Sequence, residues 1–246
     1  MKLSLLHLNN ELHFDLSRPM NISIPIQRNG SVSSFQIDGA VYVDYQDGDF
    51  IGNKNKGGAC NLETVTFTAH GNGSHTECVG HISNEKYFVN DCISDSFYLS
   101  QLHTANCKEN EDGLFVDLSS FLDSSEPGIQ ALVLRTLPNP TSKKHKDYSS
   151  SPTPCIAPDD MQKIVDLGIK HLLIDLPSVD PEWDGGKLLS HHIFWNYPKN
   201  PRLDASISEF IYINEEIEDG IYALKLNIGN FISDASPSTP TLYPIF

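Results

Sequence analysis

Twelve residues in the first third of the chain carry three histidines and a carboxylate, the densest group of candidate metal ligands in the sequence. The segment reads His70-Gly-Asn-Gly-Ser-His75-Thr-Glu77-Cys-Val-Gly-His81. Neutral imidazole and carboxylate are ligands that zinc, manganese and iron accept in proteins. If these side chains hold an ion, the polypeptide must fold so that they converge, and this is the tightest constraint that the sequence places on the structure.

The spacing of these side chains decides whether they can meet. In an extended chain alternate residues share a face, so His75, Glu77 and His81 face one way and His70 the other. Residues 71–74 form a Gly-Asn-Gly-Ser turn sequence, and Asn-Gly favours positive φ angles that could bring His70 back toward the others. We therefore expect three converging ligands, with His70 as a conditional fourth. Spacing alone leaves open that these are solvated histidines of a glycine-rich loop.

Length and charge limit the class of protein. The chain has 246 residues and a net charge of -15. This length suits one substantial core, so we expect a single domain over residues 1–246. The excess of carboxylates disfavours binding to nucleic acid or to an anionic membrane, so the expected partners are small molecules and other subunits. The first residues are too soon polar for a secretory signal and no apolar run approaches a membrane span, which predicts a cytoplasmic protein.

The cysteines do not suggest a disulfide framework. There are five, they form no CxxC pair, and they are Cys60, Cys78, Cys92, Cys107 and Cys155. An odd number without paired spacing is typical of reduced thiols. Cys78 has the opposite parity to Glu77, so we expect a buried structural thiol there rather than a ligand.

Strand patterns dominate the first half of the chain. Asp38-Gly39 between two apolar runs, 35–37 and 40–43, predicts a β-hairpin. Glu63 to Thr68 alternates polar and bulky residues, so the histidine segment is expected to begin where a strand ends. Further strands are expected over residues 22–26, 113–117, 130–135, 171–175 and 221–228.

A helix is well marked in the second half. Residues 157–168 have Pro and Asp at the start, apolar residues at helical spacing and Gly at the end. Strands on either side of this helix predict a parallel crossover unit. The segment between the first strand and the helix, residues 137–155, is rich in Pro, Ser and Lys and is interpreted as a mobile surface loop, with an active-site cover as the alternative.

Several motifs, in order along nearly the whole chain, resemble those of the putative cyclase and kynurenine-formamidase-like metal-dependent hydrolases. The histidine segment is similar to their HxGTHxDxPxH signature, and Asp175-Leu-Pro-Ser-Val-Asp180 to their IDxPSxD segment. His191 matches their following histidine, and Ile207-Ser-Glu209 their IxENL glutamate. The sequence departs from the pattern by one residue inserted between His70 and His75, Glu77 for Asp, Val79 for Pro, a longer segment at 196–206, and Thr239 for Arg. These departures indicate a divergent subgroup.

The resemblance implies a fold and a cofactor. The expected fold is an α/β, swivelling β/β/α domain with a mixed, barrel-like β core, assembled as a homodimer or larger homo-oligomer such as a tetramer. One or two divalent ions, zinc or manganese, would be held by His70, His75, Glu77, His81 and Glu209. Asp175 and Asp180 are expected to cap and brace their loop, and Ser178 is a candidate substrate contact.

The resemblance also implies a reaction. The leading hypothesis is arylformamidase-like, metal-dependent hydrolysis of an N-formyl or similar amide of a small aromatic molecule, with His191 as general acid and base and Glu209 as its partner or as a ligand. His192, next to His191, is the less favoured alternative for this role. Two other hypotheses stay open. The protein could open the ring of a cyclic amide or lactone, as isatin hydrolases do, or it could be a catalytically silent relative that only binds a ligand.

Overall fold

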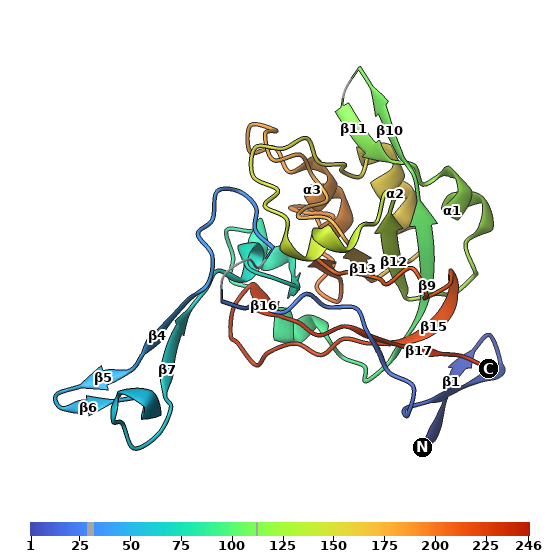
Figure 1. Cartoon of the computed structure of the whole chain (residues 1–246). Helices are drawn as coiled ribbons and strands as arrows, with labels where there is room; N and C mark the ends of the chain where they lie inside the picture. The colour runs from blue at the N-terminus through green and yellow to red at the C-terminus, as the bar shows by residue number, and fades with distance from the viewer. Residues whose placement is uncertain (29–31, 112) are drawn as a thin grey trace.

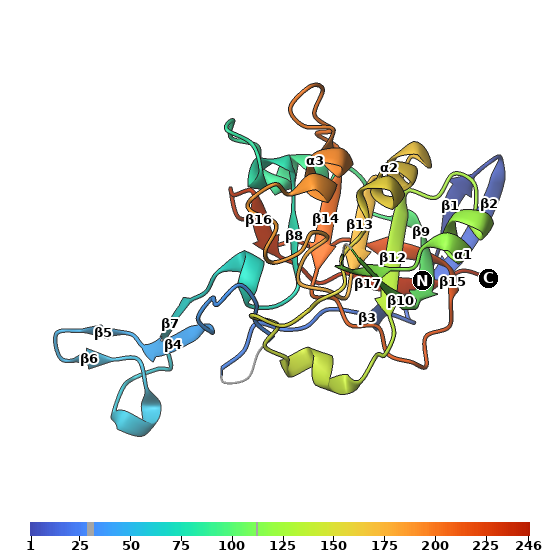
Figure 2. The ribbon, with the colours of Figure 1, turned by 90° about the horizontal axis from the view of Figure 1, so that it is seen from above.

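A single mixed β-sheet positions most of the described chain. The computed structural model describes residues 1–28, 32–111 and 113–246. Its largest sheet has nine strands in the order β16-β8-β14-β13-β12-β9-β15-β17-β3, and the sheet is curled (Figures 1 and 2). The strands are β3 (Met20–Asn21), β8 (His75–Glu77), β9 (Tyr98–Ala105), β12 (Ala131–Thr136), β13 (His171–Ile174), β14 (Ser206–Glu209), β15 (Gly220–Lys225), β16 (Ala235–Pro237) and β17 (Thr241–Pro244).

The centre of this sheet is parallel and its margins are antiparallel. Strands β9, β12, β13 and β14 pair with one another in the parallel sense, whereas every pairing that involves β8, β16, β15, β17 or β3 is antiparallel. The helix α2 (Pro158–Asp166) connects β12 to β13 and packs beside α3 (Leu189–Trp195) over the parallel strands (Figure 1). This arrangement confirms the expected crossover unit and the α/β fold with a barrel-like β core.

The parallel strands are buried on both faces. Every residue of β12 and β13 is buried. Leu132, Leu134 and Leu172 pack toward Phe194 and the helices, while Val133 and the neighbouring alternate residues pack into a second cluster with the antiparallel strands. Parallel strands covered on both sides are made of continuous apolar runs, which explains the composition of these two segments.

Most strands expected from the sequence are present, but two N-terminal expectations are wrong. The apolar run at 22–26 forms no regular strand. It contains an isolated bridge at Ser23, and the nearest strand, β3, ends before it at Asn21. The hairpin at Asp38-Gly39 does not form either. Phe35 and Gln36 have φ of 57° and 56° and leave the strand region, and β4 (Val41–Asp44) pairs instead with β7 (Glu63–Thr66). A distant β-branched partner outcompetes the local turn signal.

The segment at 137–155 is anchored rather than mobile. It contains the short 3-10 helix η5 (Thr141–His145), and Lys143 within it is 9% exposed. The Lys143 ammonium donates to Asp175 Oδ2 at 2.7 Å and to the Thr136 carbonyl at 2.7 Å, so a buried ion pair ties the segment to the ends of β12 and β13. The proline and serine content correctly predicted a loop. Composition cannot predict that one of its lysines, Lys143, is buried and anchors the segment.

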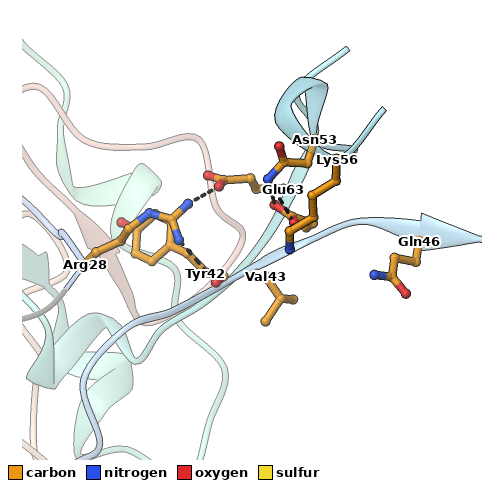
Figure 3. Close-up of a pocket in the computed structure, with 8 residues that line it drawn as sticks. Arg28, Tyr42, Val43, Gln46, Asn53, Lys56 and Glu63 are labelled. Carbon is orange, nitrogen blue, oxygen red and sulfur yellow. Dashed lines mark hydrogen bonds and ion pairs between the residues drawn. The ribbon is translucent and has the colours of Figure 1, made fainter. Parts of the chain in front are cut away.

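A two-stranded arm projects from the body beside the main sheet (Figures 1 and 2). It is built from β4 and β7 and extended by β5 (Gln46–Asp47), β6 (Phe50–Ile51) and η1 (Lys54–Lys56). Side chains cover one face of the arm. Arg28 lies over the Tyr42 ring and pairs with Glu63, and Lys56 binds Asp44 at 2.7 Å, while Val43 points to the other side (Figure 3).

The remaining elements are peripheral hairpins and short helices. They are β1 (Lys2–His7), β2 (Asn10–Asp15), η4 (Val89–Cys92), β10 (Cys107–Asn110), β11 (Gly113–Val116) and α1 (Ser119–Ser124), together with η2 and η3 described below. All five cysteines are free thiols, and Cys78 is fully buried, as expected. Among the helices of the described residues, none combines the length and the apolar character that crossing a bilayer requires.

Candidate metal centre

Strand β8 carries the centre of the cluster. His75 and Glu77 are two residues apart on this strand, so both side chains lie on one face, and each residue is fully buried. Strand β14 pairs with β8 in a register that sets Glu209 opposite His75. Residues opposite each other in an antiparallel pair share a face, and His75 Nε2 lies 3.2 Å from Glu209 Oε2. The sheet register therefore brings the third group to the site.

His70 and His81 enter from short 3-10 helices on either side of β8. They are η2 (Ala69–Gly71) and η3 (Val79–His81). His70 Nδ1 lies 3.0 Å from Glu77 Oε2, and His81 Nδ1 lies 3.8 Å from the same oxygen. The three histidines of the segment thus lie around Glu77. His81 does so through a helical turn, not through the extended parity expected from the sequence.

A glycine turn makes the approach of His70 possible. Gly73 has φ of 133°, a left-handed conformation that favours glycine, and a Cβ there would lie 3.0 Å from the Ile24 carbonyl oxygen. The Asn72 side chain accepts a hydrogen bond from the Thr68 backbone at 2.8 Å and closes the same turn. The Asn-Gly sequence therefore brings His70 back toward β8. This turn was the condition under which His70 could be a fourth ligand.

Helix α3 contributes one of its two adjacent histidines. His191 Nε2 lies 3.3 Å from Glu77 Oε1 and 4.0 Å from Glu209 Oε1. His192 lies beside the Tyr197 ring, with its Nδ1 3.1 Å from the Tyr197 carbonyl oxygen. Neighbouring helical residues point about 100° apart, so only His191 belongs to the cluster.

Hydrogen-bond acceptors behind the histidines orient their inner nitrogens. Asp180 Oδ2 lies 2.7 Å from His191 Nδ1, Asp234 Oδ2 lies 2.8 Å from His70 Nε2, and the Gly73 carbonyl lies 3.1 Å from His75 Nδ1. A carboxylate or carbonyl oxygen can only accept, so each of these outer nitrogens carries the hydrogen. The inner nitrogen of each neutral ring is then free to bind a cation or a proton.

Buried polar atoms without hydrogen-bond partners remain at the centre. They are His75 Nε2, both Glu77 carboxylate oxygens and Glu209 Oε1. Two groups of three residues place their ligand atoms within 4.8 Å of one another. One group is His70, Glu77 and His81, and the other is His75, Glu77 and Glu209, so Glu77 belongs to both. Burying such groups unpaired is costly. Two adjacent divalent cations would satisfy these atoms, and the His/Glu donor set suits zinc or manganese.

The pKa values of the cluster residues show that its carboxylates attract positive charge. Burial raises the pKa of Glu77, but His81, His191 and His70 outweigh it and hold the pKa well below its usual range. Burial lowers the pKa of His191, yet its bonds to Asp180 and Glu77 raise it to about 10. His70 behaves alike, with Asp234 and Glu77 raising its pKa to about 10. Without a cation, protons on imidazole compensate the carboxylates, and a bound metal would displace them.

Asp234 is the member of the cluster that the sequence analysis missed. It precedes β16, which pairs with β8 and sets Ala235 opposite Glu77. The Asp234 carbonyl accepts from the Cys78 backbone at 2.9 Å, and its carboxylate also lies 3.7 Å from His81 Nδ1. No local pattern marks this residue, because its place depends on the pairing of strands some 150 positions apart in the sequence. Asp180, in contrast, braces His191 and so performs the bracing expected for its loop.

A pocket of about 450 Å³ opens over the cluster. His70, His81, His191 and Glu209 form its inner wall, and Ser178 also lines it. Most of its other lining side chains are apolar or acidic, namely Phe35, Ile37, Pro177, Pro181, Leu188, Glu182 and Asp184, and Thr68 and Gly186 complete the lining. The turn at residues 35–36, which broke the expected hairpin, is the feature that directs Phe35 and Ile37 to this pocket.

The fold and the cluster together define a mixed, curled sheet that presents histidines and glutamates to a pocket beside its antiparallel edge. This is a cyclase-like architecture. The sequence profile described as "Putative cyclase" matches residues 14–181, which is more than half of the chain. The chain therefore belongs to the putative cyclase family.

Solved structures of this fold cover almost the whole chain. A structure titled "The Structure Of Potential Metal-Dependent Hydrolase With Cyclase Activity" aligns with a TM-score of 0.63 at 13% identity, covering 92% of this chain and 97% of that one. A predicted metal-dependent hydrolase from Bacillus stearothermophilus aligns with a TM-score of 0.61 at 13% identity, over 92% and 98%. Isatin hydrolase A from Labrenzia aggregata aligns with a TM-score of 0.61 at 12% identity, over 92% and 93%. A comparison with curated proteins gave no match.

Proposed function

We propose that this protein is a metal-dependent hydrolase that cleaves an N-formyl or similar amide of a small aromatic molecule. The observation that carries the proposal is the set of buried, unpartnered atoms of His75, Glu77 and Glu209 facing a pocket. Membership of the cyclase family and the fold shared with metal-dependent hydrolases support the same reaction class.

The residues divide into two ligand sets that share one carboxylate. His70, Glu77 and His81 would hold one ion, and His75, Glu77 and Glu209 the other. When bound, a divalent ion supplies a water of lowered pKa and polarises the substrate carbonyl. Glu77 would contribute to both sets, so the side chain that replaces the usual Asp of the family pattern is central to the proposed site.

His191 is the proposed general acid and base. Its Nε2 faces the cluster and carries the proton that the leaving amine requires, while Asp180 fixes the ring through Nδ1 and stabilises the protonated form. Asp180 also accepts from the backbone N–H groups of Ser190 and His191, so it is itself held rigidly. Amide hydrolysis depends on this proton because an amine anion is a poor leaving group.

The pocket suits an aromatic group. Phe35, Ile37 and Leu188 give it apolar surface, and its volume of about 450 Å³ falls in the range of small-molecule sites. A cyclic amide such as isatin has the same scissile bond and similar dimensions, and the shared fold with isatin hydrolase A makes ring opening the second candidate. A catalytically silent binding protein is the third, and it predicts metal-free protein or metal without turnover.

The test combines metal analysis with turnover. We expect protein purified without chelator to hold close to one or two zinc or manganese ions per chain and to hydrolyse formanilide, N-formylkynurenine or isatin. His75→Ala and Glu77→Ala should lose metal and turnover together, because the ligands act as a unit. His191→Ala should keep metal and lose at least about 100-fold in kcat, with His192→Ala as the matched control that keeps both. Full activity in His75→Ala would refute the site.

A further inference from the structure

The charged side chains that line the pocket bear on the charge of the substrate, whereas the metal ligands bear only on the bond that is cleaved. Two carboxylates, those of Glu182 and Asp184, line the pocket and accept hydrogen bonds from loop backbone rather than from the histidines of the cluster. The described residues that line this pocket include no lysine and no arginine. Lys187, from the same loop, lines the neighbouring groove, which Asp184 also borders and Glu182 does not.

The two carboxylates are fixed by uncharged partners. The Ser150 backbone N–H donates to Glu182 Oε2 at 2.7 Å. The backbone N–H groups of Gly186 and Leu188 donate to Asp184, the first at 2.7 Å. These bonds hold the side chains in place but add no formal positive charge, so the negative potential at this part of the pocket is not neutralised locally.

The metal centre does not remove this potential. Two divalent cations would carry four positive charges, which would balance the four carboxylates of the cluster, those of Glu77, Glu209, Asp180 and Asp234. The inner wall, where the scissile carbonyl must sit, would then be neutral as a whole. The part of the substrate that lies away from the carbonyl then faces Phe35, Ile37, Glu182 and Asp184. A substrate carboxylate in this region would meet like charge, and the net charge of -15 on the chain adds to the repulsion.

We propose that the pocket selects aromatic amides whose distal part is neutral or cationic and rejects those that carry a distal carboxylate. This inference rests on the proposed hydrolase function and narrows its substrate class. It favours simple aryl formamides or a neutral lactam such as isatin over an aryl amide whose distal carboxylate has no ammonium group beside it. Glu182 is the specificity residue that the structure assigns, because it can be neutralised without losing its hydrogen bond.

The experiment compares three N-formyl anilides that differ only in the para substituent, which is methyl, carboxylate or aminomethyl. With zinc-loaded protein we expect similar or higher kcat/KM for the cationic compound than for the neutral one, and at least about 10-fold lower kcat/KM for the carboxylate. Each unit charge contributes about 3- to 10-fold at such separations near a surface. Raising the ionic strength should reduce the difference.

Glu182→Gln is the decisive variant. The glutamine oxygen can still accept from Ser150 N–H, so the loop should keep its structure. We expect the variant to raise kcat/KM for the carboxylate at least about 3-fold relative to the methyl compound. Glu218→Gln, remote from the pocket lining, is the matched control and should leave the ratio unaltered. Equal turnover of all three compounds, or an unchanged ratio in Glu182→Gln, would overturn the inference.

A binding measurement separates failure of this inference from failure of the proposed function. If metal-loaded protein hydrolyses none of the three anilides, the hydrolase proposal fails for this substrate class. Competition NMR with 4-methylbenzamide, 4-carbamoylbenzoate and 4-(aminomethyl)benzamide then still reports the preference of the pocket. Weaker binding of the carboxylate, relieved in Glu182→Gln, would support the charge selection, and tighter binding of the carboxylate would refute it.

Discussion

Single atoms on the outer side of the histidines determine how the candidate metal centre is organised. Asp234 holds His70, Asp180 holds His191, and the Gly73 carbonyl holds His75, each through the nitrogen that faces away from Glu77. Such contacts fix the tautomer and the ring orientation of a ligand and increase its basicity. Gly73 and Asp180 belong to motifs recognised in the sequence, whereas Asp234 belongs to none, so the orientation of His70 depends on a residue that no local motif contains.

Asp234→Asn tests this organisation at the residue scale. Asparagine keeps the size of the side chain but removes the charge that holds His70 Nε2–H. We expect the affinity for zinc to fall about 10- to 100-fold, as for other carboxylates that support a histidine ligand. Chelator competition measures this affinity without any substrate. Asp204→Asn, which removes an exposed carboxylate paired with Lys170, is the control, and equal affinity in the two variants would contradict the role of Asp234.

At the scale of elements, the loops that form the pocket are fastened to the ends of the parallel strands. Asp175 ends the β13 segment and accepts hydrogen bonds from the backbone and hydroxyl of Thr136, both at 2.9 Å, at the end of β12. Lys143 from η5 completes this buried junction. Pro177 and Ser178 follow directly and line the pocket, so the ion pair supports the strand ends from which the pocket lining continues.

Removing the Lys143 ammonium should destabilise the folded protein, because the buried Asp175 carboxylate then has no counter-charge. Burial raises the pKa of Asp175, and Lys143 and Thr136 oppose that rise. Lys143→Met leaves the carboxylate uncompensated, and we expect a loss of about 3 to 5 kcal/mol in the free energy of unfolding near neutral pH. With its pKa raised in the folded state, Asp175 binds a proton more readily there than in the unfolded chain, so the loss should shrink as the pH falls through the folded pKa.

Urea unfolding of Lys143→Met at two pH values measures this effect. The double variant Lys143→Met/Asp175→Asn should recover part of the stability at neutral pH and lose the pH dependence of the single variant. Lys144→Met, an adjacent lysine outside the ion pair, serves as the control for lost charge. A single variant as stable as the control would show that the junction contributes little.

At the scale of the whole molecule, the projecting arm has one covered and one uncovered face. By the β4 to β7 register, Val41 and Val43 lie opposite Thr66 and Thr64, on the face away from Arg28 and Glu63. Val41 and Val43 are 51% and 52% exposed. Isolated two-stranded sheets are marginally stable in water, so this uncharged face needs a partner. On a chain with a net charge of -15, a face without charged side chains also limits the repulsion that a second copy would meet.

We propose that this face of the arm is an interface between two copies of the chain, in keeping with the homo-oligomer that the family resemblance implies. Light scattering coupled to gel filtration should then give a dimer or tetramer. Val43→Asp should shift the mass toward the monomer, because it places like charges across the interface. Leu6→Asp, at an apolar residue 81% exposed on another hairpin, is the control and should leave the mass unchanged. A monomeric parent protein would refute the proposal.

The sequence by itself determined the parts of this protein that depend on short-range spacing. The crossover of β12, α2 and β13, the shared face of His75 and Glu77, the return of His70 through Gly73 and the burial of Cys78 all follow from periodicity or turn chemistry within a few residues. Such features are encoded locally because side-chain direction has a fixed period along a strand or helix.

Only the tertiary structure decided the parts that depend on strand register and on packing between distant segments. The pairing of β14 and β16 with β8 brought Glu209 and Asp234 to the cluster, the orientation of α3 selected His191 over His192, and the pairing of β4 with β7 overrode the expected hairpin. Each of these outcomes depends on competition among many long-range partners, and a local pattern contains no information about which partner is present.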